Sequence, residues 1–395
     1  FGFYGVPTLD GYFEMFGTAF AKLESAVLEL RKLVVFDKLG SHQIIVDAAN
    51  GVPGPQLKTM VEKVLAINEE SLVNRFQIIN VNNYRQLNEQ CGSDHIKTSK
   101  RTPRGVPSRV KLRHCCSIDG DGDRIVYWFC NHRPTVQLLD GDRIAALICK
   151  FLVDISRRPE LQPNPFKDMN MGVVQTLYSN GACTAFIEQV LNVSVVFAET
   201  GVKNLHREAI KFDVGIYFEA NGHGTVLYGQ KFRNRLDNAI YEAGVSGNKL
   251  SLKWLNLLKH FISLSNIAVG DAICDLLMVE SILTFYNWQP DKEWFGMYDD
   301  YPNVLGVMTV PDKSRFVVDG PKCKVLGPVP VAKLLEKVVA ECEEKCRAFI
   351  RPSGTENVLR IYTEAETSNT AEEIHEQIKQ GIEQFVDDES KPSHS

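Results

Sequence analysis

The sequence lacks an excess of positive charge, a long hydrophobic run and a recognisable leader. Its 395 residues carry 44 Lys and Arg against 49 Asp and Glu, which gives a net charge of −5 and a pI of about 6.0. Without a basic field, we expect no nucleic-acid partner. No apolar run approaches the roughly 18–20 residues that cross a bilayer, and no secretory signal is visible, so we expect no membrane partner. The composition leaves the oligomeric state open.

The ten cysteines also lack the spacing of a zinc or redox site. Cys115 and Cys116 are adjacent, Cys342 and Cys346 lie one helical turn apart, and no Cys-x-x-Cys pair exists. Scattered cysteines of this kind are typical of reduced, structural thiols in a reducing compartment. We therefore predict a cytoplasmic protein.

Helix-like and strand-like segments alternate through most of the chain. Apolar residues at helical spacing predict one long helix over 11–35. Short strands and helices then alternate twice, an order typical of parallel sheets that are covered by helices on both faces. We therefore predict the α/β class, with a surface loop over 91–110 and a helix over 138–153. The predicted strands are 44–46, 76–81, 116–118, 125–129, 173–177, 193–197 and 214–218, with 226–228 paired to the last.

The C-terminal part has a different composition. Segment 288–330 is rich in Pro, Asp and aromatic residues, and a helix over 329–342 is predicted to lead into two strands, 347–350 and 358–362. Thr370 and Glu373 predict a capping box at the start of a last helix. We expect the polar tail 387–395 to be frayed. The apolar face of this helix is predicted to comprise Ile374, Ile378, Ile382 and Phe385.

Residues 119–124, Asp-Gly-Asp-Gly-Asp-Arg, are the most informative motif. Three carboxylates so close together repel one another, whereas carboxylate oxygens are the ligands that a hard cation such as Mg²⁺ prefers. The glycines let the backbone turn all three side chains inward. Arg124 adds a positive charge where an anion could meet the metal. The motif predicts a metal-assisted phosphate site with Asp119, Asp121 and Asp123 as ligands.

The sequence of this loop allows other interpretations. An EF-hand needs glycine at position 6 and glutamate at position 12, and here those positions hold Arg124 and Cys130, so it is excluded. A phosphatase that uses a nucleophilic aspartate, served by Asp119 and Asp121 after a short strand, stays open. A solvated acidic turn between two strands stays open as well.

A second loop, 219–224, follows a predicted strand. Glu219 and Asn221 carry hydrogen-bonding groups that suit adjacent hydroxyls of a sugar, and the glycines allow a tight turn and a close ligand. His223 could act as an acid or a base near neutral pH. The alternative is a hairpin turn whose polar side chains bind no ligand, because Asn-Gly is a strong turn signal by itself.

A third loop, 351–356, lies between two predicted strands. Arg351 offers two parallel hydrogen bonds to a phosphate, and Ser353 and Thr355 offer hydroxyls. Backbone N–H groups around Gly354 can converge on an anion, and Arg360 on the next strand could reach the same anion. A simple β-turn is the alternative. One phosphorylated sugar, held in a cleft where domains meet, would use all three loops.

These motifs together resemble the α-D-phosphohexomutase superfamily, and within it the phosphoacetylglucosamine mutases. The resemblance covers nearly the whole chain in the expected order. The Glu-Ala-Asn-Gly-His-Gly form of the second loop points to the N-acetylglucosamine branch. The segments that carry the resemblance are 117–127, 217–225 and 349–360, with 172–176 and 199–203.

The resemblance implies a four-domain fold with three related α/β domains and a smaller C-terminal α+β domain. It implies that 1–35 is a remnant of domain 1 with a linking helix, that 36–137 and 138–268 are α/β domains 2 and 3, and that 269–395 is domain 4. It further implies interconversion of N-acetylglucosamine 6-phosphate and 1-phosphate through a phosphoserine and a 1,6-bisphosphate, with Mg²⁺ on the three aspartates. By resemblance, Arg124 and Lys203 assist the transfer, and the substrate is bound by Glu219, Ala220, Asn221, His223, Arg351, Pro352, Ser353, Gly354, Thr355 and Arg360.

The chain departs from the family pattern in one respect. The family's nucleophilic serine lies in a Thr-Ala-Ser-His-Asn-Pro segment, and this sequence contains none, because Ser41-His42 is followed by Gln43. We expect an N-terminally truncated chain that turns over little substrate alone. The alternative is a non-catalytic protein that binds sugar phosphates. Gly122, where relatives of this branch often carry Ala, is a smaller departure that we expect to be harmless.

Overall fold

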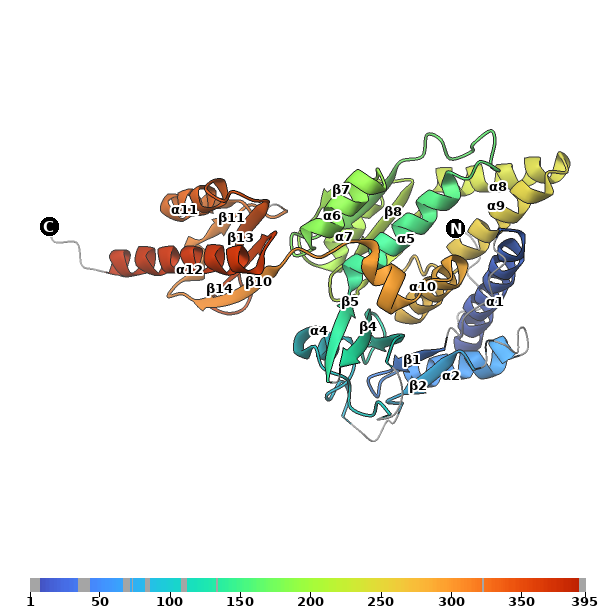
Figure 1. Cartoon of the computed structure of the whole chain (residues 1–395), viewed down its shortest axis with the longest axis horizontal. Coiled ribbons are helices and arrows are strands. Elements are labelled where there is room, and N and C mark those ends of the chain that lie inside the picture. The colour runs from blue at the N-terminus through green and yellow to red at the C-terminus, as the bar shows by residue number, and fades with distance from the viewer. Residues whose placement is uncertain are drawn as a thin grey trace. The chain divides into compact units, whose positions relative to one another are not determined.

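The computed structural model divides into two compact units. The first comprises Phe1–Gln175, Phe186–Val196 and Gly201–Tyr298, and the second Thr176–Ala185, Phe197–Thr200 and Asp299–Ser395 (Figure 1). Among the helices that the structure describes, none is long and apolar enough to cross a membrane. All ten cysteines are thiols. The described residues are 8–34, 43–66, 72, 74–81, 86–107, 112–132, 134–321 and 323–390.

A five-stranded mixed sheet carries the N-terminal half of the first unit. Its order is β2-β1-β3-β4-β5, in which β1 pairs in parallel with β2 and β3, whereas β3–β4 and β4–β5 are antiparallel. The central strands are buried because isoleucine, valine and cysteine fill both of their faces. The strands are β1 (Ile44–Asp47), β2 (Phe76–Ile79), β3 (Cys115–Ile118), β4 (Ile125–His132) and β5 (Thr135–Leu139). Its helices are α2 (Pro53–Met60), continued by a π-helix (Val61–Leu65), and α4 (Ser93–Ser99).

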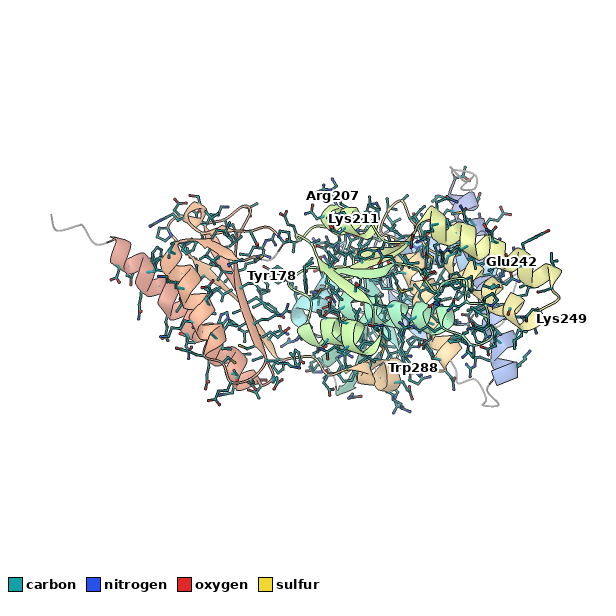
Figure 2. All side chains as sticks on the ribbon, turned by 90° about the horizontal axis from the view of Figure 1, so that it is seen from above. Tyr178, Arg207, Lys211, Glu242, Lys249 and Trp288 are labelled. Carbon is teal, nitrogen blue, oxygen red and sulfur yellow. The ribbon has the colours of Figure 1, made fainter. Side chains whose placement is uncertain are left out.

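A four-stranded sheet, of order β7-β6-β8-β9, forms the other half of the first unit. β6 and β8 are parallel, and β9 returns antiparallel to β8. α8 and α9 form a helical hairpin whose turn follows Val245, with Glu242 in the last turn of α8 and Lys249 at the start of α9 (Figure 2). The strands are β6 (Met171–Gln175), β7 (Ser194–Phe197), β8 (Val214–Phe218) and β9 (Gly224–Tyr228). The helices are α5 (Gly141–Ser156), α7 (Val202–Ala209), α8 (Gln230–Val245), α9 (Lys249–Ile262) and α10 (Ala272–Tyr286).

Helix α1 (Leu9–Val34) packs on α9 and α10 and brings a charge into the core. Glu24 accepts a hydrogen bond from Arg75 at 2.5 Å, and Arg75 also donates to Thr284 at 2.7 Å. Glu280 lies 3.4 Å from Arg75 and 2.8 Å from His114. All four ionisable side chains are at most 6% exposed. This buried charge network (Glu24, Arg75, His114 and Glu280) joins α1, α10 and the five-stranded sheet.

The second unit is built on an antiparallel sheet of order β10-β14-β13. One face packs on α11 and α12 through a single apolar core. The opposite face carries Phe349 and Tyr362, which stack on each other and contact the ring of Tyr178. The strands are β10 (Asn303–Thr309), β13 (Cys346–Pro352) and β14 (Val358–Ala365), with a small ladder of β11 (Val317–Val318) and β12 (Val325–Gly327). The helices are α6 (Gly181–Ala185), which runs on into a π-helix of the first unit (Phe186–Val190), α11 (Val329–Ala340) and α12 (Ser368–Ser390).

Several predictions of secondary structure are wrong. The predicted loop over 91–110 contains α4, which has a single buried apolar residue, Ile96, and therefore no periodic signal. The predicted helix over 138–153 begins only at Gly141, because Leu138 and Leu139 belong to β5. Thr367, not Thr370, caps α12, since its hydroxyl accepts the Thr370 N–H at 3.2 Å. The expected frayed tail is helical through Ser390, and 391–395 lie outside the described residues.

The apolar face of α12 is confirmed, because Ile374, Ile378 and Ile382 are buried and Phe385 packs on the same core. The domain bounds remain predictions. The structure groups 269–298 with the first unit, whereas the sequence placed this segment in domain 4. Ser41-His42 lie outside the described residues.

Candidate active site

The aspartate loop is a tight turn between β3 and β4, and Asp119 organises it. Its Oδ1 accepts the backbone N–H groups of Gly122 at 3.2 Å, Asp123 at 3.1 Å and Arg124 at 3.1 Å. Gly122 takes a φ of 85°, a conformation that glycine adopts without strain. The backbone oxygen of Gly122 accepts the N–H of Ala272 at 2.9 Å, so the first residue of α10 holds the loop from outside.

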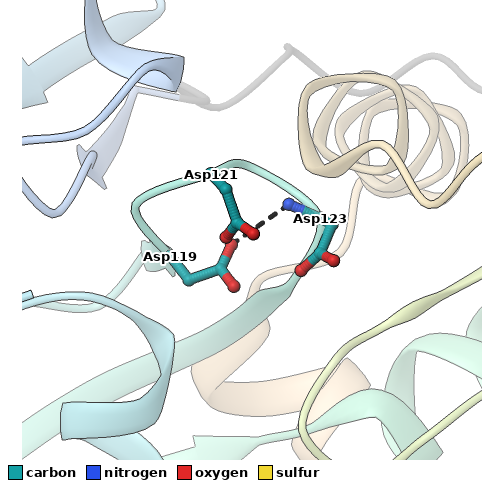
Figure 3. A group of neighbouring side chains, drawn as sticks. All are labelled: Asp119, Asp121 and Asp123. Atoms are coloured by element: carbon teal, nitrogen blue, oxygen red, sulfur yellow. Dashed lines mark hydrogen bonds between the residues drawn. The ribbon is translucent and has the colours of Figure 1, made fainter. Parts of the chain in front are cut away.

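The turn brings its three carboxylates together (Figure 3). One oxygen from each of Asp119, Asp121 and Asp123 lies within 4.8 Å of the others. Burial first, and then the charges of Asp123 and Asp121, raise the pKa of Asp119 to about 7, although the hydrogen bond from the Arg124 backbone lowers it. Oδ1 of Asp123 is buried and accepts no hydrogen bond within the described residues. Three carboxylates that converge, one of them with a buried oxygen that accepts no hydrogen bond from the described residues, fit a small divalent cation.

Arg124 lies among carboxylates from two elements. Its Nε is 3.7 Å from Asp119 and 3.6 Å from Asp123, and its Nη1 is 3.2 Å from Asp94. Asp94 lies in the first turn of α4 and was not predicted as a site residue, because its segment was predicted to be a loop. The guanidinium is only one third exposed, so its charge is presented beside the three aspartates.

The second loop, which we call the sugar loop (219–224), is a hairpin turn between β8 and β9. Oε1 of Glu219 accepts the N–H of Gly201 at 2.9 Å, and Oδ1 of Asn221 accepts the N–H of His223 at 3.0 Å. Nδ2 of Asn221 donates to Glu219 at 3.4 Å. The two polar side chains are thus held next to each other, with Ala220 between them. Lys203 is exposed in the first turn of α7, two residues after Gly201.

The aspartate loop and the sugar loop are joined directly. The N–H of Ile125 donates to the carbonyl of Gly222 at 3.2 Å, and Arg124 and His223 form a backbone bridge. Nδ1 of His223 lies 3.5 Å from Oδ2 of Asp123. Two motifs about 100 residues apart in the sequence therefore form one continuous site within the first unit.

We expect Gly222→Ala to separate these loops. At φ 88° a side chain is strained by about 1–3 kcal/mol, and the added Cβ would lie 1.8 Å from the carbonyl oxygen of Ile125. The midpoint of urea denaturation, followed by tryptophan fluorescence, should fall. Gly244→Ala is the matched control, because that glycine lies in α8 with no atom within 4 Å of a new Cβ, and it should gain up to about 1 kcal/mol. Equal midpoints for the two variants would contradict this expectation.

The third loop, the phosphate loop (351–356), starts later in the structure than the sequence predicted, because Arg351 and Pro352 still belong to β13, and the connection to β14 in the second unit starts at Ser353. Arg351 and Arg360 are paired directly across the two strands, so their side chains leave the same face of the sheet about 5 Å apart. Oγ of Ser353 accepts the N–H groups of Thr355 and Glu356, each at 3.4 Å. Nothing lies within 4 Å of where a Gly354 side chain would begin, so the turn is open. Two like charges at this spacing favour an anion between them.

A cavity of about 440 Å³ lies beside Arg351 and Pro352 in the second unit. Tyr178, Glu199 and Thr200 contribute to its walls. Of these residues, only Glu199 and Thr200 belong to a segment, 199–203, that carries the resemblance described from the sequence. Tyr178 follows a buried strand and carried no signal of its own. The cavity places polar groups next to the predicted phosphate anchor, as a phosphorylated ligand requires.

Three sequence models of known families match the chain in order. Residues 4–126 match phosphoacetylglucosamine mutase AMG1, domain II, and residues 140–288 match its domain III. Residues 315–381 match the C-terminal domain of phosphoglucomutase/phosphomannomutase. The matches place the aspartate loop, the sugar loop and the phosphate loop each under a different model.

Full-length relatives and solved structures agree with these matches. The chain is 37% identical to phosphoacetylglucosamine mutase of Saccharomyces cerevisiae, over 95% of this chain and 65% of the relative. It is 34% identical to that of Homo sapiens, over 98% and 66%. The structure of Aspergillus fumigatus N-acetylphosphoglucosamine mutase in complex with GlcNAc-6P and magnesium superposes with a TM-score of 0.82 at 34% identity, over 96% of this chain and 71% of that one. The chain therefore spans slightly less than two thirds of the first two relatives.

Proposed function

Because the chain belongs to the phosphoacetylglucosamine mutase family, we propose that it binds a phosphorylated N-acetylhexosamine and serves the interconversion of N-acetylglucosamine 6-phosphate and 1-phosphate, on the route to UDP-N-acetylglucosamine. The observation that carries the proposal is the direct union of the aspartate loop with the sugar loop through the Arg124–His223 bridge. We also propose a cytoplasmic location, which the ten cysteine thiols support.

The aspartate loop is proposed to hold Mg²⁺ through Asp119, Asp121 and Asp123. The ion, when bound, neutralises charge on the oxygens of a transferring phosphoryl group. Arg124 supplies a fixed positive charge next to these carboxylates and is itself held by Asp94. Phosphoryl transfer requires positioning and charge neutralisation more than covalent help, and the loop's own residues provide both.

The other two loops are proposed to hold the sugar phosphate. Glu219 and Asn221 lie next to each other and offer an acceptor and a donor, a pair suited to neighbouring hydroxyls. Arg351 and Arg360, with the hydroxyls of Ser353 and Thr355, are proposed to bind the phosphate that does not react. Binding energy from this remote group can orient the reacting end of the substrate. Lys203 is proposed to assist near the transferring phosphate.

We expect residues 1–395 alone to bind N-acetylglucosamine 6-phosphate but to convert little or none of it. The reason is the absence from the sequence of a Thr-Ala-Ser-His-Asn-Pro segment that would carry the phosphoryl group. Phosphorus NMR of the 6-phosphate, incubated with the purified polypeptide and Mg²⁺, should show no 1-phosphate, while calorimetry shows binding. Robust conversion would contradict the expectation, and absence of binding would overturn the proposed function.

A non-catalytic sugar-phosphate binding protein remains the second candidate, because the three loops suffice for binding. The coding sequence upstream of Phe1 separates the two: a Ser-His-Asn-Pro segment there supports the mutase. The phosphatase hypothesis requires Asp119 to attack a phosphate, yet its Oδ1 already accepts three backbone N–H groups. Trapping of an aspartyl-phosphate that Asp119→Asn abolishes would revive that hypothesis.

A further inference from the structure

His223 is the one side chain of the sugar loop that reaches the aspartate loop. Its Nδ1 lies 3.5 Å from Oδ2 of Asp123, and its side chain is only 14% exposed. The imidazole is confined on its other side by Gly270, where an added Cβ would lie 2.6 Å from both Cδ2 and Nε2 of the ring. The same Cβ would lie 3.2 Å from the carbonyl oxygen of Asp123. Because Gly270 has no side chain, the His223 ring has room to pack against the aspartate loop.

The backbone around this contact is fixed on three sides. Arg124 and His223 form a bridge, Asn221 accepts the His223 N–H at 3.0 Å, and the N–H of Ala272 holds the carbonyl of Gly122 at 2.9 Å. Neither end of the His223–Asp123 contact can drift without breaking a backbone hydrogen bond. By contrast, Oδ1 of Asp123 accepts no hydrogen bond within the described residues, so its carboxylate depends on Arg124 and His223 for its orientation.

We propose that His223 is a positioning residue for the cation site, which orients the Asp123 carboxylate through an Nδ1–H donor and so makes the sugar loop part of the metal site. The inference rests on the proposed function insofar as Asp119, Asp121 and Asp123 hold a divalent cation. Groups that orient a ligating carboxylate set metal affinity, and their loss costs about 10–100-fold.

The test measures binding of Mn²⁺, a paramagnetic substitute for Mg²⁺, to residues 1–395 by the electron paramagnetic resonance signal of the free ion. We expect His223→Ala to weaken Mn²⁺ binding about tenfold. His223→Asn should restore most of the loss, because its amide nitrogen occupies the place of Nδ1. Gly270→Ala should also weaken binding, since it displaces an intact ring. His260→Ala on α9, away from both loops, should leave Mn²⁺ affinity unchanged.

Each other outcome overturns the inference. Unchanged Mn²⁺ affinity in His223→Ala, an equal loss in the Ala and Asn variants, or a wild-type chain that binds no Mn²⁺ would each do so. Far-ultraviolet circular dichroism identifies a variant that fails to fold, and Gly270→Ala then decides the question. A parallel titration with N-acetylglucosamine 6-phosphate separates the two proposals. A chain that binds Mn²⁺ through His223 but binds no sugar phosphate overturns the proposed function and supports this inference.

Discussion

Arg75→Met is expected to lower the free energy of unfolding of the first unit by about 3–5 kcal/mol, the usual cost of removing one partner of a buried ion pair. Arg75 donates to Glu24 at 2.5 Å and to the backbone oxygen of Glu280 at 2.8 Å. Without the guanidinium, two carboxylates that are at most 3% exposed lose the cation between them, and His114 and the Tyr127 hydroxyl beside Glu280 do not replace it. Methionine matches the volume, so the loss reports charge rather than a cavity.

Urea denaturation followed by tryptophan fluorescence measures this effect selectively. All four tryptophans, at positions 128, 254, 288 and 294, lie in the first unit. Arg104→Met is the matched control, because its partner Glu89 lies 4.0 Å away and both side chains are about half exposed. An exposed pair of this kind contributes less than about 1 kcal/mol. If the two variants lose the same stability, the buried charge network does not hold α1 and α10 to the sheet.

Arg351→Ala is expected to weaken binding of N-acetylglucosamine 6-phosphate by roughly 10- to 100-fold, because a charge-assisted hydrogen bond contributes about 1.5–3 kcal/mol. Arg351 faces Arg360 across two strands and lines the cavity of the second unit. Asp121→Ala should cost far less, since a metal ligand near the reacting end adds little to anchoring of the other phosphate. Calorimetry with the purified chain measures both.

Two further variants test whether the phosphate loop, and not the aspartate loop, binds the phosphate that does not react. Arg351→Lys keeps the charge but loses the planar fork, so its affinity should fall between that of the wild type and that of the Ala variant. Lys337→Ala on α11 removes a cation whose partner is the exposed Glu341, and it should change nothing. Equal losses for Arg351→Ala and Asp121→Ala would count against a phosphate loop that binds the non-reacting end.

The strands and the three loops could be predicted because their signals are local. Ile44–Val46 and Val214–Phe218 are apolar throughout, and both proved to lie in buried strands. The sequence also predicted that Asp119, Asp121 and Asp123 would converge. The reason is that the glycines between them let a loop between two strands turn all three side chains inward. Glycine at position 122 takes a left-handed conformation there, which local composition had suggested.

The remaining features depend on which strands become neighbours, and local composition does not determine that. Asp94 was missed because α4 buries one apolar residue and so has no helical period. The union of the aspartate and sugar loops arises because the turns after β3 and β8 meet, although their strands belong to different sheets. The prediction that one sugar phosphate uses both loops requires the loops to lie close together. It did not include the contact through His223.

The edge-on contact of Tyr178 with the rings of Phe349 and Tyr362 limits where this chain can be recombined with its relatives. Arg347 also donates to the carbonyl of Ser179, and Glu364 accepts the N–H of Gly181 at 3.1 and 3.0 Å. A chimera recombined at Asp299 would take the C-terminal sheet from one parent and the 176–185 segment from the other. A chimera made at that point would pair two surfaces that never evolved together. A functional hybrid must therefore take 176–185 and the C-terminal chain from the same parent.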